Sequence, residues 1–146
     1  MNFDLIRRKL IEKLPFYASI INSVQFKELA IANPIACTDG KDVYYNPNYF
    51  KNLTEEQVIF AFANAICHIG FHDVTRLEDK NALVWNIATD AVINEFLRKM
   101  GLNGIKGLID IPTGSLNAED LYNKLMEQEK KGTIQLNGDG STKIHI

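Results

Sequence analysis

The stretch from Thr54 to His72, TEEQVIFAFANAICHIGFH, constrains the fold of this chain more than any other. Thr54 is followed three residues later by Gln57, which makes the capping box that is typical of a helix start. The residues that follow are apolar on nearly every side, so we expect a helix that is buried all round. Three strongly polar side chains interrupt it at intervals of four and therefore share one face: Asn64, His68 and His72.

A second long helix is predicted from Ala82 to Met100, with Gly101 as the left-handed residue that ends it. It is apolar over most of its surface and also carries a row of polar residues at fourfold spacing: Asn86, Asp90 and Asn94. A buried polar group without a partner costs about 1–3 kcal/mol. We therefore expect the two polar rows to face one another.

Short segments with strand character precede the first long helix, and turn signals separate them. One signal is Asn33-Pro34, and the second is the turn from Thr38 to Lys41, in which Gly40 is free to adopt a positive φ. The strands predicted for this small sheet are Lys27–Ala32, Ile35–Thr38 and Val43–Tyr45.

Helices are also predicted near the ends of the chain, at Asp4–Leu14 and Ala118–Lys130. The tail alternates around Asn137-Gly138-Asp139-Gly140, which predicts a β-hairpin. The predicted fold is a single α+β domain, in which a small β-sheet packs beside a helical core of two long buried helices. We expect this domain to span residues 1–132, with residues 133–146 as a C-terminal β-hairpin or tail.

Composition excludes several classes of function. The 146 residues are 46% hydrophobic and 23% charged, which is typical of one soluble globular domain. A net charge of −2 with scattered cations argues against a nucleic-acid partner, and no apolar run is long enough to cross a membrane. The N-terminus lacks the continuous apolar core of a signal peptide. Cys37 and Cys67 lie in apolar surroundings, so we expect reduced thiols in a cytoplasmic protein.

The polar rows support two interpretations. Two histidines at i and i+4 on a helix are the arrangement by which HExxH enzymes hold zinc, and Asp90 would be the natural third ligand beside His68 and His72. Ile69 stands where that motif has its glutamate, so the general base is absent. In the other interpretation the histidines belong to a buried hydrogen-bond network, completed by three amides: Asn64, Asn86 and Asn94.

Four blocks of the sequence resemble, in the same order, the metallopeptidase domain that precedes a von Willebrand factor A-like domain in many bacterial proteins. The blocks are ACTDG (36–40) with VYYNP (43–47), residues 53–72, WNIATDAVIN (85–94) and AEDLY (118–122). The resemblance covers roughly residues 1–130 and implies a zincin-like fold.

The HExxHxxxH pattern of that family can be laid on this chain residue by residue. Its first histidine falls on Asn64 and its glutamate on Ala65, while the second and third histidines fall on His68 and His72. The family's aspartate falls on Asp90. The resemblance therefore implies a reduced metal site, with zinc as the cofactor, from which one ligand and the general base have been lost.

These observations lead to one functional prediction and two alternatives. We predict a non-catalytic metallopeptidase-like domain, a pseudoenzyme without catalytic residues, that acts by binding a protein partner. The first alternative is a metal-dependent hydrolase that takes its base from elsewhere, such as Asp73 or Glu95, although Asp73 directly follows His72 and is expected to point away from the polar row. The second is a metal-binding module without chemistry. The sequence does not determine the oligomeric state.

Overall fold

The central helix begins where the capping box predicts. In the computed structural model, which describes residues 1–30, 35–105, 111–132, 134–136 and 142–144, the Thr54 side chain accepts from the Gln57 amide and the Gln57 side chain accepts from the Thr54 amide. The helices are α1 (Phe3–Lys13), η1 (Pro15–Tyr17), α2 (Ala18–Ser23), α3 (Pro47–Phe50), α4 (Glu55–Gly70), η2 (Thr75–Leu77), α5 (Ala82–Lys99) and α6 (Ala118–Lys130). The strands are β1 (Phe26–Glu28), β2 (Cys37–Thr38), β3 (Val43–Tyr45), β4 (Ile134–Leu136) and β5 (Thr142–Ile144).

The small sheet has the order β1-β3-β2, with β1 parallel and β2 antiparallel to the central strand β3. Gly40 adopts a φ of +94° in the turn between β2 and β3, as predicted. Strand β1 begins at Phe26, one residue before the predicted start at Lys27, and ends at Glu28. The Asn33-Pro34 turn lies outside the described residues. The three-stranded sheet beside long helices confirms the predicted α+β class.

The predicted C-terminal hairpin agrees with the pairing of β4 and β5, which are antiparallel with Gln135 opposite Lys143. The residues expected to form its turn lie outside the described ranges. At the other long helix, Gly101 adopts a φ of +83° just after α5, in agreement with its predicted role as the terminating residue.

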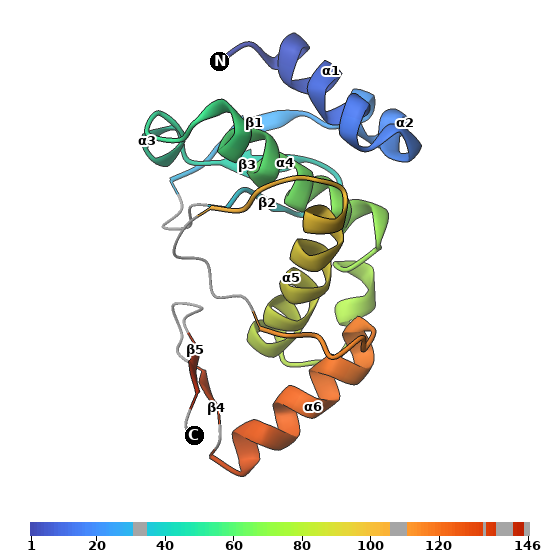
Figure 1. The fold of residues 1–146 in the computed structure, drawn as a ribbon, viewed down its shortest axis with the longest axis vertical. Helices are drawn as coiled ribbons and strands as arrows, with labels where there is room; N and C mark the ends of the chain where they lie inside the picture. Colours follow the sequence, from blue (N-terminus) through green and yellow to red (C-terminus); the bar gives the residue numbers. More distant parts are fainter. Residues whose placement is uncertain (31–34, 106–110, 133, 137–141, 145–146) are drawn as a thin grey trace.

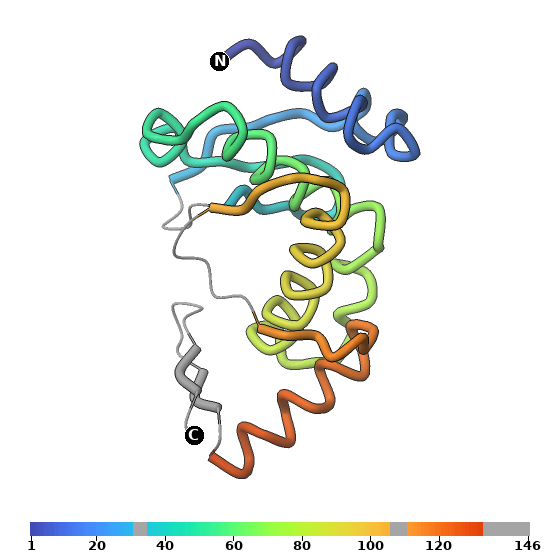
Figure 2. Tube along the Cα trace, in the orientation of Figure 1, coloured from blue at the N-terminus to red at the C-terminus, as the bar shows by residue number. Residues whose placement is uncertain are grey.

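The buried apolar side chains of the described residues form two hydrophobic clusters, and α5 contributes to both. The larger cluster joins α1, α2, the sheet and α4 to the second half of α5, where Ile93 and Leu97 are fully buried. The smaller cluster packs α6 on the first half of α5: Val84, Ala88, Ala91, Ile111, Leu121 and Leu125. Figures 1 and 2 show α5 running between the end of the molecule that holds the sheet and the end that holds α6.

Among the described residues, no helix combines the length and the apolar character that crossing a bilayer needs.

Candidate functional site

His68 lies on the last turn of α4 and places each ring nitrogen against a different carboxylate. Its Nδ1 is 2.9 Å from Oδ2 of Asp73, in the turn after α4, and its Nε2 is 2.8 Å from Oδ1 of Asp90 on α5. The side chain of His68 is 14% exposed and that of Asp73 only 5%, whereas Asp90 is 36% exposed. The imidazole of His68 therefore joins the turn after α4 to α5 through two short polar contacts.

The protonation state of His68 follows from these partners. An ionised carboxylate only accepts hydrogen bonds, so a ring that contacts two of them must donate from both nitrogens, and only the imidazolium cation can do so. Burial by itself lowers the pKa of His68, but the hydrogen bonds to Asp73 and Asp90 outweigh it and raise the pKa to about 9. His68 is therefore a cation at neutral pH.

Asn64 extends the cluster one turn up α4. Its Nδ2 donates to Oδ1 of Asn94 on α5, at 3.0 Å, and approaches Oδ1 of Asp90 at 3.4 Å. Asn64 and Asn94 are almost completely buried. The prediction that the two polar rows face one another is thus confirmed for two residues of each helix.

The structure leaves His72 and Asn86 out of this cluster. Asn86 is exposed one turn before Asp90 on α5, and His72 is exposed beyond the end of α4 with a φ of +58°. The prediction that α4 continues to His72 is wrong, because the helix ends at Gly70 in a Schellman motif. In that motif the His72 amide donates to the Ile69 carbonyl and the Asp73 amide donates to the His68 carbonyl, both at 3.0 Å.

The glycine of this helix end is not at the left-handed position. Gly70 lies inside the last turn, where an added Cβ would meet Cζ of Tyr17 at 2.3 Å. The close approach of Tyr17 from η1 therefore requires a glycine at position 70, and the left-handed conformation is left to His72. Nothing in the local sequence distinguishes this arrangement from a helix that continues.

Asp73 is the site residue that sequence reasoning placed wrongly. It was expected to point away from the polar row, but the reversal of the chain at His72 returns its carboxylate to His68. Its carbonyl accepts a 2.8 Å hydrogen bond from Nε1 of Trp85, and its second carboxylate oxygen lies 3.4 Å from Nη1 of Arg76. Asp73 is consequently held from three directions.

Arg76 links this cluster to the smaller core and was missed entirely by the sequence analysis. It donates to the Phe71 carbonyl at 2.8 Å and, through Nε, to Glu119 of α6 at 2.8 Å. Its guanidinium lies 5.3 Å from the ring centre of Trp85. The other predicted base, Glu95, instead accepts from Thr113 and pairs with Lys99.

We tested whether these side chains fit a zinc centre. A catalytic zinc takes three protein ligands with free lone pairs, together with a water. Both nitrogens of His68 are engaged by carboxylates, and Asn64 turns its amide NH2, which has no lone pair, toward Asp90. Across the ranges that the structure describes, no group of three or more His, Cys, Asp or Glu side chains is arranged to hold a metal ion. The described residues therefore do not fit such a centre.

The structure also has no ionisable side chain at the position of the family's general base. The position that corresponds to its glutamate is Ala65, which is completely buried and carries no ionisable group. The arrangement as it stands can hold a proton and a network of charges, but it offers no open coordination position.

The chain was compared with families, curated proteins and solved structures. A family model described as "Putative metallopeptidase domain" matches residues 3–144. No curated protein and no solved structure matches, so the zincin-like character of the fold stays a prediction, as does a following von Willebrand factor A-like domain. Because the family model covers nearly the whole chain, this protein belongs to the family of that metallopeptidase domain.

Proposed function

We propose that this chain is a non-catalytic member of its family, a pseudoenzyme that acts by binding a protein partner. The observation that carries the proposal is the state of His68, both of whose nitrogens are taken up by Asp73 and Asp90. With Ala65 in the position of the base, the cluster holds charge but lacks the water-activating glutamate of the family pattern.

The two replacement bases considered for a hydrolase are already engaged. Asp73 is buried and bonded to His68, and Arg76 lies beside it. The hydrogen bonds that Glu95 accepts from Thr113 and Lys99 lower the pKa of its carboxyl group, which makes it a weaker base. Both arrangements support a domain that has kept the fold without the chemistry.

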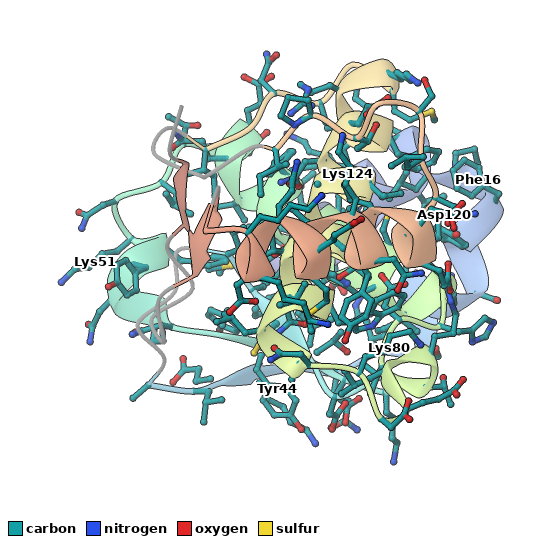
Figure 3. All side chains as sticks on the ribbon, turned by 90° about the horizontal axis from the view of Figure 1, so that it is seen from below. Phe16, Tyr44, Lys51, Lys80, Asp120 and Lys124 are labelled. Carbon is teal, nitrogen blue, oxygen red and sulfur yellow. The ribbon has the colours of Figure 1, made fainter. Side chains whose placement is uncertain are left out.

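Partner binding is supported by an aromatic surface cluster of Phe16, Tyr17, Phe71 and Phe96. Phe16 is 56% exposed and packs edge-to-face against Tyr17 and Phe96, with ring centres 4.8 and 6.0 Å away. Figure 3 shows Phe16 at the rim of the molecule. Aromatic side chains held rigidly at a surface are enriched in protein interfaces and often dominate their binding energy.

Peptide turnover tests the non-catalytic part of the proposal. The purified chain is incubated with a peptide library, with and without added Zn2+, beside a His68→Gln variant as the control. We expect no cleavage above that of the variant under either condition. Metal-dependent cleavage that the wild type shows and His68→Gln lacks would establish the hydrolase alternative instead.

Site-specific photo-crosslinking tests the binding part. A photoreactive phenylalanine analogue replaces Phe16, and a matched protein carries it in place of Tyr49, which is 40% exposed on α3 outside the aromatic surface cluster. In cells of the source organism we expect one reproducible crosslinked protein from position 16 that position 49 does not give. Equal crosslinking at both positions, or none at position 16, would contradict the proposal.

A further inference from the structure

We propose that the side chains between α4 and α5 no longer fit a metal ion, and that Asn64 keeps metal out by donating its amide hydrogens to Asp90. The inference concerns the same cluster on which the proposed function rests, and it deepens that function by stating why this cluster takes no ion.

Asp90 is the point at which the donors converge. Its Oδ1 accepts hydrogen bonds from Nε2 of His68 at 2.8 Å and from Nδ2 of Asn64 at 3.4 Å. These two donors lie one turn apart on α4. A carboxylate that ligates a metal must direct a lone pair at the ion, whereas this oxygen is directed at two N–H groups. Two hydrogen bonds therefore occupy the place in which a bound cation would lie.

The orientation of the Asn64 amide is held from its other side. Its Nδ2 donates to Oδ1 of Asn94 at 3.0 Å, and both side chains are buried. Turning the Asn64 carbonyl oxygen toward Asp90, as metal ligation would require, would break the bond to Asn94. It would also place two carbonyl oxygens against each other in a site from which water is largely excluded.

The carboxylates around His68 already have partners within the protein. Two of them face His68, Asp73 from the turn after α4 and Asp90 from α5, and Arg76 from η2 lies beside Asp73 and also pairs with Glu119 of α6. Burial raises the pKa of Tyr17, packed from η1, and of Cys67, on α4 itself, to about 12, so both stay neutral. A bound ion would have to displace these partners from the carboxylates.

Nuclear magnetic resonance of the ring nitrogens tests the proposal on the wild-type protein. With 15N-labelled histidine, we expect the ring-nitrogen signals of His68 to stay unchanged when Zn2+ is added in excess. His72, which is exposed and lies outside the cluster, serves as the reference. A zinc-induced shift of the His68 signals would overturn the proposal.

Two substitutions test the role of Asn64. Asn64→His supplies a lone pair in place of the amide hydrogens, and Asn64→Asp supplies a carboxylate, so we expect both variants to bind Co2+ about 100-fold more tightly than the wild type, measured by the absorption of the bound ion. Asn48→His, at an exposed position of α3, is the matched control and should gain nothing. If the folded Asn64 variants gain no affinity, Asn64 does not exclude the metal; if neither variant folds, the wild-type spectrum decides the proposal.

The results separate this inference from the proposed function. Zinc bound at His68 without any peptide cleavage would overturn the inference and leave the non-catalytic binding function standing. Peptide cleavage by a protein whose His68 binds no metal would do the reverse.

Discussion

The polar residues of the two long helices fall into two regions with opposite environments. In the buried region, Asn64 and His68 of α4 meet Asp90 and Asn94 of α5, and every one of them has a hydrogen-bond partner on the other helix. In the exposed region, His72 and Asn86 have the same spacing in sequence but face solvent. Fourfold spacing thus identifies which residues share a helix face, whereas burial and partners decide which of them matter.

The contrast has a simple energetic consequence. Removing one member of a buried charged cluster leaves its partners without compensation in a poorly solvated place, whereas an exposed side chain is replaced by water at little cost. The four predictions below test this difference, from the largest expected effect to the smallest.

The largest effect is expected at His68, in comparison with His72 just beyond the end of α4. His68→Ala should lower the free energy of unfolding by about 3–5 kcal/mol, because it removes the nearest partner of the buried Asp73 carboxylate and leaves only the longer contact to Arg76. His72→Ala should change it by less than about 0.5 kcal/mol, because the ring is exposed. Urea unfolding of both variants measures the difference, and equal losses would refute the division into two regions.

Between pH 6 and pH 8, stability should depend on pH through His68. The folded pKa of about 9 lies above the ordinary value of 6.5, so the stabilisation is fully present below pH 6.5 and is lost as the pH rises through 9. We expect a loss on the order of 2 kcal/mol between pH 6 and pH 8, measured by urea unfolding. The His68→Gln variant is the control and should lack this loss, whereas His72→Gln should keep it.

The end of α4 should be sensitive at Gly70. Gly70→Ala places a methyl group against the Tyr17 ring and should cost about 1–3 kcal/mol. Gly104→Ala is the matched control, since its Cβ would stand 3.6 Å from Phe60, an ordinary contact. If thermal unfolding shows the same melting temperature for both variants, Tyr17 does not dictate the glycine.

The smallest effect is expected at His72, and it has the opposite sign. His72→Gly removes a side chain from a left-handed conformation and should stabilise the protein by up to about 1 kcal/mol. Denaturant unfolding at neutral pH measures the change. A clear destabilisation would mean that the His72 ring makes a contribution that its exposure does not reveal.

Much of the fold was accessible from sequence because its signals are local. The capping box at Thr54 and the terminating Gly101 act within one helical turn, and the spacing of the polar rows follows from the helix repeat. The small sheet was also predicted in outline, although the partner of each strand was not. For the site, the facing of Asn64 and His68 toward Asp90 and Asn94 followed from the cost of burying unpaired polar groups.

The sequence by itself therefore determined the two long helices, their starts and the residues of their polar faces. Only the tertiary structure decided that α4 ends at Gly70, that His72 faces solvent and that Asp73 returns to His68. The physical reason is that the contacts at this end of α4 come from residues remote in sequence, since Tyr17 closely approaches Gly70 and Nε1 of Trp85 donates to the Asp73 carbonyl. Helix periodicity and capping are properties of neighbouring residues, whereas that close approach exists only once the chain has folded.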